Sequence, residues 1–144
     1  MSEEAPPAIL MAFPHTQYHP EARLVTWHPR GVFDDALADR IVEFIDSEEH
    51  IADAPFHRST DFNGLTEIHL KFGHAFQIAE HRHAGYAGEP VKSAFVSDWV
   101  IGLGIARMYA ALMEGSPIEV RAFRSRDAAA EWLGVREEIL HPCA

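Results

Sequence analysis

The sequence predicts an α/β fold in which a five-stranded, mostly parallel sheet starts with an antiparallel hairpin and carries about four helices. Residues 91–97 and 118–123 are short β-rich runs that flank one apolar helical stretch. Strand–helix–strand units of this kind normally join neighbouring parallel strands. The rest of the chain extends the alternation, because two strands are followed by helix, strand, helix, strand, helix, strand and helix.

The N-terminal hairpin is predicted from two short runs and the turn between them. Pro14 interrupts residues 9–18, which restricts this segment to an edge strand. Residues 23–27 alternate as a strand does, and residues 20–22 supply the turn. Residues 28–31 then bend the chain out of the sheet.

An acidic amphipathic helix is predicted over residues 34–49. Its buried stripe comprises Leu37, Ile41, Phe44 and Ile45 at helical spacing. The segment holds seven acidic residues and one arginine, a balance of −6. A solvated face explains this charge, since exposed charges are normal on a surface helix. Docking of a basic protein partner on helix 34–49 is the alternative.

Further elements surround the central unit. A polar run at 56–62 is the third strand, and Thr66 caps a helix over residues 67–83. After the last strand, Ser125 caps a final helix, which ends at Gly134.

We expect residues 9–135 to form a single domain, between a disordered segment at 1–8 and a C-terminal tail at 136–144. A chain of 144 residues can bury a core without disulfides. The lone Cys143 cannot form a disulfide within one chain, so a reducing cytoplasm is the simplest location. No apolar run reaches the length of a membrane span. The net charge of −10 argues against nucleic-acid binding, which needs a basic face.

The helix at 99–113 is apolar on two sides. Ile101, Ile105, Met108, Tyr109 and Leu112 form one stripe at helical spacing. The opposite side also lacks charge, and such a helix is usually buried on both sides. Either this chain or a second subunit covers it, and the candidate dimer face comprises Trp99, Leu103, Ala106 and Ala110.

No pattern predicts a metal, a cofactor or a catalytic centre. His74 and His81 share one helix face and could form a two-ligand surface site, but no further ligands complete a metal set. Gly102-Leu103-Gly104 begins like a dinucleotide fingerprint, yet it lies inside a helix, where close packing explains it better. Nucleophile signatures are also missing from the sequence.

Two sets of residues are candidates for binding. In open sheets of this type, ligands and partners meet the loops at the carboxyl ends of the strands. The polar residues expected there are Asp61, Asn63, Thr66, Ser97 and Asp98. The second set is aromatic and lines an apolar pocket if the core is not fully packed: Phe62, Phe72, Phe76, Trp99 and Tyr109.

Several motifs resemble the STAS group, the sulphate-transporter and anti-sigma-factor-antagonist domains, and in particular its uncharacterised bacterial relatives. The motifs are 60–66 (TDFNGLT), 90–96 (PVKSAFV), 104–109 (GIARMY), 119–123 (EVRAF) and 129–133 (AAEWL). The resemblance implies a STAS-like fold from about Arg23 to Leu133. In signalling members, a partner kinase phosphorylates a serine after the third strand. The matching residues here are 69–72 (HLKF), which offer no hydroxyl, so this switch is predicted to be absent.

We therefore expect a non-enzymatic, cytoplasmic STAS-like module that acts by protein binding, as a homodimer. The alternative is a carrier or sensor of a small apolar, lipid-like ligand held among the aromatic residues. A hydrolase that uses surface histidines such as His74 ranks last.

Overall fold

The computed structural model describes residues 15–51 and 54–142. Five strands form the central sheet in the order β1-β2-β4-β6-β7. They are β1 (Thr16–His19), β2 (Leu24–Trp27), β4 (His57–Asp61), β6 (Val91–Val96) and β7 (Ile118–Phe123). Strand β1 pairs antiparallel with β2, whereas the other neighbours pair in parallel, so the predicted fold class and hairpin are confirmed.

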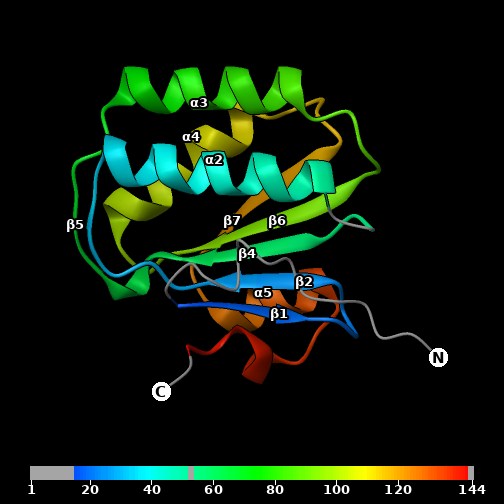
Figure 1. Cartoon of the computed structure of the whole chain (residues 1–144). Coiled ribbons are helices and arrows are strands. Elements are labelled where there is room, and N and C mark those ends of the chain that lie inside the picture. Colours follow the sequence, from blue (N-terminus) through cyan, green and yellow to red (C-terminus); the bar gives the residue numbers. More distant parts are fainter. Residues whose placement is uncertain (1–14, 52–53, 143–144) are drawn as a thin grey trace.

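Helices cover both faces of this sheet (Figure 1). Helices α2 (Asp35–Ile51), α3 (Phe72–Gly85) and α4 (Val100–Leu112) form a layer on one face. Helix α5 (Arg126–Leu133) and the short 3₁₀ helix η2 (Glu137–Leu140) lie on the other. We call these the three-helix side and the α5 side.

Strand β6 shows how alternate residues are divided between the two sides. Val91, Ser93 and Phe95 face the three-helix side. Ala94 and Val96 instead join the apolar cluster under α5. This period of two follows from the pleat of the strand.

The α5 side has an apolar core that reaches into the expected C-terminal tail. Ser125 Oγ accepts a hydrogen bond from Ala128 N, and Gly134 ends the helix with a φ of 74°, so both predicted caps are present. The tail assignment fails for η2, because Leu140 is buried. Leu140 packs in one cluster with Leu24, Ala94, Val96, Ala129 and Ala130.

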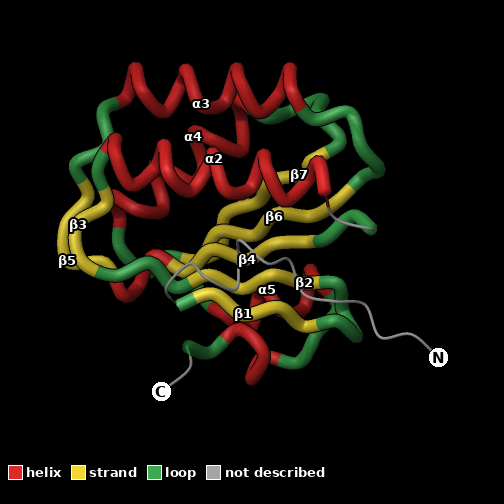
Figure 2. Tube along the Cα trace, viewed as in Figure 1, coloured by secondary structure: helices red, strands yellow, loops and turns green. Residues whose placement is uncertain are grey.

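A second, two-stranded sheet corrects the predicted helix at 67–83. Strand β5 (Leu65–Ile68) pairs in parallel with β3 (Gly31–Phe33), close to the starts of α2 and α3 (Figure 2). Thr66 therefore lies exposed in a strand and caps no helix. Pairing with a distant segment outweighed the helical pattern predicted to begin at Glu67, because strand formation depends strongly on context.

The side of α4 predicted as a dimer face is covered by the same chain. Leu103 and Ala106 are buried, while Trp99 and Ala110 are half-buried against neighbouring apolar clusters. Ile101, expected to face inward, is 64% exposed.

Gly102 helps to explain which side of α4 faces the sheet. A Cβ atom at this position would lie 2.4 Å from Ser97 Oγ and 3.2 Å from Ser97 Cβ, so a larger residue would displace Ser97, the residue that follows β6. This contact confirms the packing explanation for Gly102.

The predicted disordered segment at 1–8, and residues 9–14 of the predicted edge strand, lie outside the described residues.

Candidate functional site

A cavity of about 110 Å³ lies between the central sheet and the three-helix side. Its floor is formed by β4 and β6, which present Arg58, Thr60 and Ser93 where larger apolar side chains would fill the space. Protein interiors normally leave few voids larger than one water molecule. The cavity therefore results from short or polar side chains on two central strands.

The walls of the cavity are apolar. Helix α2 contributes Ala38, Ile41, Val42 and Ile45, α3 contributes Ala75 and Ile78, and α4 contributes Ile105 and Ala106. Three separate helices thus line a space that is mainly apolar, although α3 also contributes Arg82 to its wall.

The five aromatic residues predicted to line a pocket do not all lie together. Phe62 and Tyr109 line the cavity, and Trp99 packs against the cluster that contains Phe62. Phe72 and Phe76 do not line this cavity and are 72% and 44% exposed. Helix α3 starts five residues later than predicted, at Phe72 instead of Glu67, and its buried residues are Ala75, Ala79 and Arg82.

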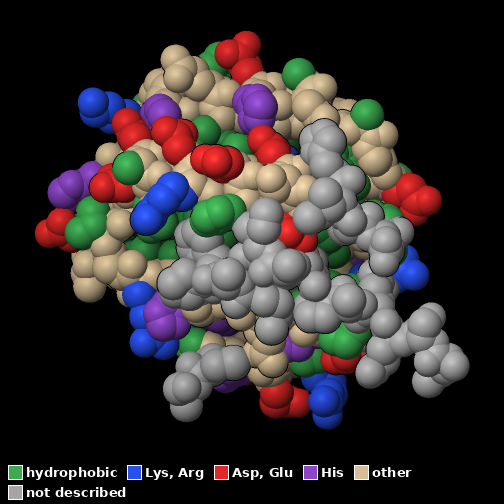
Figure 3. All heavy atoms as spheres, in the orientation of Figure 1, with side chains coloured by type: hydrophobic (Ala, Val, Ile, Leu, Met, Phe, Trp, Pro, Cys, Tyr) green, Lys and Arg blue, Asp and Glu red, His purple; other side chains and the backbone are tan. Residues whose placement is uncertain are grey.

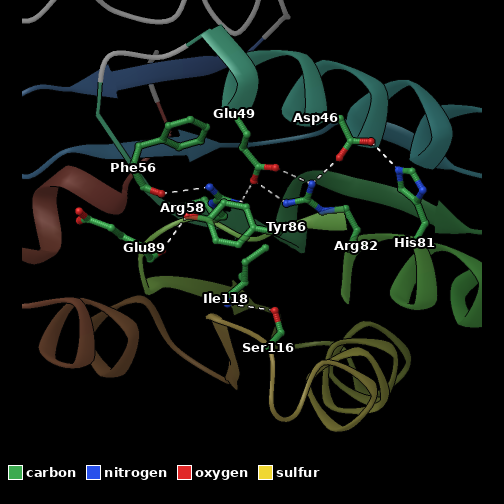
Figure 4. Close-up of polar contacts among 10 residues, drawn as sticks. All are labelled: Asp46, Glu49, Phe56, Arg58, His81, Arg82, Tyr86, Glu89, Ser116 and Ile118. Carbon is green, nitrogen blue, oxygen red and sulfur yellow. Dashed lines mark hydrogen bonds and ion pairs between the residues drawn. The ribbon is translucent and has the colours of Figure 1, made fainter. Parts of the chain in front are cut away.

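A network of charged side chains, shown in Figure 4, adjoins the cavity. Glu49 Oε2 accepts hydrogen bonds from Arg58 Nη1 and Arg82 Nη2, each at 2.6 Å. Arg82 Nη1 donates to Glu49 Oε1 at 2.7 Å and also to Asp46. Asp46 in turn pairs with His81 Nε2 at 2.6 Å. The network joins α2, β4 and α3 around two buried guanidinium groups.

The network is electrically balanced. Burial alone would raise the pKa of Glu49, but the hydrogen bonds and charges of Arg82 and Arg58 hold it below its usual value. Burial lowers the pKa of Arg58; arginine nevertheless stays charged at neutral pH. For Arg82, burial acts in the same direction, yet contact with Glu49 outweighs it and raises the pKa. The two positive charges of Arg58 and Arg82 thus balance the two negative charges of Glu49 and Asp46.

Arg58 lies between the cavity and the surface. Its Nη2 donates to Phe56 O at 3.1 Å, and its Cζ lies 4.6 Å from the centre of the Phe56 ring. A surface hollow of about 160 Å³, lined by Phe56, Tyr86 and Glu89 among others, has Arg58 and Glu49 in its wall. Because Arg58 lines both spaces, it forms part of the wall between them.

Helices α2 and α3 are also connected by two histidine–aspartate pairs. His74 Nε2 lies 2.7 Å from Asp39, and seven residues further on His81 contacts Asp46. Figure 3 shows acidic and histidine side chains over these two helices. The two predicted histidines do share a face, but each contacts an aspartate. Within the described ranges, no group of three or more His, Cys, Asp or Glu side chains is arranged to hold a metal.

The polar residues expected at the carboxyl ends of the strands largely come together. Asn63 Oδ1 accepts from Asp98 N at 2.9 Å, and Asp61 Oδ1 accepts from Asn63 N at 2.9 Å. Ser97 is fully buried and accepts from Trp99 N at 3.2 Å. Thr66 lies apart in β5. These contacts bind neighbouring loops to one another.

Asp61 has a further partner on the α5 side, where Arg126 Nε donates to Oδ2 at 2.7 Å. Burial would raise the pKa of Asp61, but contacts with His28, Asn63 N–H and Arg126 hold it below its usual value. This carboxylate therefore joins α5 to the end of β4 in a structural role.

The charged network was not predicted from the sequence. Arg58, Arg82 and Glu49 belong to three elements, and only the charge of Glu49 was considered, as part of the acidic face of helix 34–49. One signal was present: β4 is a central strand, yet it is polar throughout, HRSTD. A polar residue in a central strand must either reach a partner or line a cavity.

Comparison of this chain with protein-family models, curated proteins and solved structures finds no match. The STAS resemblance therefore remains a prediction that rests on the sequence motifs. No helix among residues 15–51 and 54–142 has the length and apolar character needed to cross a bilayer.

Proposed function

We propose that this protein is a non-catalytic module that binds a small, mostly apolar molecule inside the three-helix side. One observation carries the proposal: a cavity of about 110 Å³ with mainly apolar walls lies between the sheet and three helices, where protein interiors are normally filled. Every charged side chain of the adjoining network already has a charged partner. Because these side chains are paired with one another, the network stabilises the shape of the cavity and offers no obvious nucleophile or general base.

The volume limits the size of the ligand. Each water molecule occupies about 30 Å³ in the liquid, and an engineered cavity of about 150 Å³ holds benzene. We therefore expect a ligand of roughly six non-hydrogen atoms. A lipid chain is too large for the cavity, so we propose a small compound instead of the predicted lipid-like ligand. A very efficient small ligand gains no more than about 1.5 kcal/mol of binding free energy per non-hydrogen atom, so the dissociation constant would be sub-micromolar at best.

A nuclear magnetic resonance titration with cyclopentane tests the proposal. We expect the methyl resonances of Ile41, Ile78 and Ile105 to shift with saturation, while those of Leu140 on the α5 side stay unchanged. Ala75→Leu should fill the cavity and abolish the shifts. The same change at the exposed Ala128 is the matched control. If the three isoleucine methyls do not respond in the wild type, the proposal is wrong.

Protein binding by a STAS-like module is the second candidate function. A specific observation favours it: Phe72, at the start of α3, and Val100 and Ile101, at the start of α4, are 72%, 85% and 64% exposed. Phe72 also belongs to the segment that the resemblance matches to the phosphorylation site. The acidic helix supports a basic partner less well, because Asp39, Asp46 and Glu49 already pair within the chain.

Light scattering after size-exclusion chromatography tests the homodimer. We expect a dimer at micromolar concentration that Ile101→Glu converts to a monomer, whereas Arg107→Glu, on the same helix, should leave the dimer intact. A monomeric wild type would remove the homodimer from this proposal without affecting the cavity.

A further inference from the structure

We infer that the ligand carries one neutral oxygen acceptor, a ketone- or lactone-type carbonyl, and that Arg58 Nε–H donates a hydrogen bond to it. This inference rests on the proposed function, because it concerns the same cavity. It names the chemical class of the ligand and the residue that selects it.

The first observation is an unused donor. Arg58 has a side chain that is 5% exposed, and its two terminal nitrogens donate to Glu49 and to Phe56 O. Its Nε is buried and has no hydrogen-bond partner in the part of the chain that the structure describes. Buried donors are almost always satisfied, so we expect an acceptor at this atom when a ligand is bound. The atom has almost no accessible surface, so the Arg58 side chain must shift slightly for an acceptor in the cavity to reach it.

The second observation is the position of this side chain. Arg58 lines the cavity together with Arg82 and the hydroxyl-bearing Thr60, Ser93 and Tyr109. Arg58 and Ser93 are direct neighbours across the β4–β6 pair, and Thr60 lies two residues further along the same face. The remaining walls are mainly aliphatic or aromatic. The cavity thus offers polar contacts from the sheet and apolar contacts from the helices, which suits a compact apolar body with one polar atom.

The third observation is the charge balance, which decides between a neutral and an anionic acceptor. The guanidinium groups of Arg58 and Arg82 already face the carboxylates of Glu49 and Asp46. A ligand carboxylate would leave an extra negative charge in a buried site, and that is strongly unfavourable. A carbonyl accepts the hydrogen bond without adding charge. An alcohol would in addition have to donate its own hydrogen to one of the hydroxyls of Thr60, Ser93 or Tyr109, whereas a carbonyl needs no such partner.

Three probes of similar size separate these possibilities. Cyclopentanone carries the carbonyl, methylenecyclopentane replaces its oxygen with a CH₂ group, and cyclobutanecarboxylate is anionic. We expect the two neutral probes to bind the wild type and the carboxylate to give no saturable shift. In Arg58→Lys, which keeps a positive charge for Glu49 but lacks Nε–H, the affinity of the ketone relative to the alkene should fall by about tenfold. Arg121→Lys, at an exposed arginine on the α5 side, should leave this ratio unchanged.

A second measurement needs no variant. The Nε–H resonance of Arg58 in the wild type should shift on addition of cyclopentanone and stay in place with methylenecyclopentane. An unchanged resonance with both probes, as expected if only water occupies this point, would overturn the inference. So would an unaltered affinity ratio in folded Arg58→Lys, or tighter binding of the carboxylate. If neither neutral probe binds, the proposed function itself is wrong. If both bind but Arg58 does not distinguish them, only the inference about the carbonyl is wrong.

Discussion

The two faces of the central sheet are built from the same strands but packed differently. On the α5 side, Leu24, Ala94 and Val96 meet Ala129, Ala130 and Leu140 in a continuous apolar cluster. On the three-helix side, the neighbouring residues Arg58, Thr60 and Ser93 face a cavity and a charged network. The alternation of side chains along β6 therefore separates an apolar cluster from a side with free volume.

This difference shows where the chain departs from simple core packing. Apolar residues at the central positions of the three-helix side would fill the cavity, as they do beneath α5. Buried ion pairs are weak contributors to stability, since apolar replacements of similar volume are often neutral or better. Among the described residues, both ion-paired arginines with buried side chains, Arg58 and Arg82, lie on the three-helix side, whereas Arg126 of the Asp61 pair on the α5 side is 28% exposed. This is consistent with the binding role proposed for the three-helix side.

The largest expected effect comes from breaking the charged network. Glu49→Gln leaves Arg58 and Arg82 without their shared carboxylate, and removal of one partner from a buried pair costs about 3–5 kcal/mol. Urea denaturation would measure the loss. The control is Glu119→Gln, because Glu119 forms an exposed pair with Arg121 and should change stability by under about 1 kcal/mol. Equal effects of the two substitutions would show that the network has no special role.

The α5 side should respond to loss of apolar volume. Leu140→Ala removes a buried side chain from the cluster under α5, and such truncations cost about 2–5 kcal/mol. The exposed Val100 of α4 offers the comparison, since Val100→Ala should have little effect. A stable Leu140→Ala variant would support the original view of residues 136–144 as a tail.

Enlarging one alanine on each side compares the free volume directly. Ala75→Leu on α3 can extend into the cavity, so the free energy of unfolding should stay within about 1 kcal/mol of the wild type. Ala129→Leu on α5 has no such space and should lose about 1–3 kcal/mol through overpacking. Thermal and urea unfolding of both variants would decide, and a larger loss for Ala75→Leu would contradict this account.

The smallest effect is a dependence of stability on pH. Burial, together with the charges of Lys92, Arg58 and Arg23, lowers the pKa of His57, whose Nδ1 accepts from Lys92 N at 3.0 Å. The unfolded chain therefore binds this proton more readily, with a pKa of about 6.5. The free energy of unfolding should rise with pH from the folded-state pKa up to about 6.5 and then level off.

His57→Asn keeps an acceptor for Lys92 N but does not titrate, so it should reduce the slope of this part of the curve. Some slope should remain because burial also lowers the pKa of His19. Glu49 and Asp61, whose pKa values are lowered, add stability above about pH 4.5 that disappears as the pH falls further. This lower window should remain in His57→Asn. Urea midpoints at a series of pH values would measure both windows, and an unchanged slope between pH 5 and 6.5 would contradict the assignment to His57.

The elements that the sequence predicted well depend on local signals. The unit from Val91 to Phe123 has strands and a helix long enough to show their own periodicity, and Ser125 and Gly134 mark helix ends by their chemistry. The pairing of β3 with β5 could not be predicted in this way. Each strand is short, and its partner lies more than thirty residues away.

The candidate site was harder to predict than the fold. Phe62 and Tyr109 were found because large aromatic residues at helical or strand spacing indicate a core. Arg58, Arg82 and Glu49 were missed because a single sequence does not reveal which charges face each other. The direction of α4 also depended on a contact, that of Gly102 with Ser97, which spacing alone does not show.

Xenon binding in a crystal of the wild-type protein would test the central difference between the two sides most directly. We predict a xenon site enclosed by Ile41, Ile78 and Ile105, and none among Ala94, Ala129 and Leu140. Absence of xenon from the three-helix side, or equal occupancy beneath α5, would contradict the account.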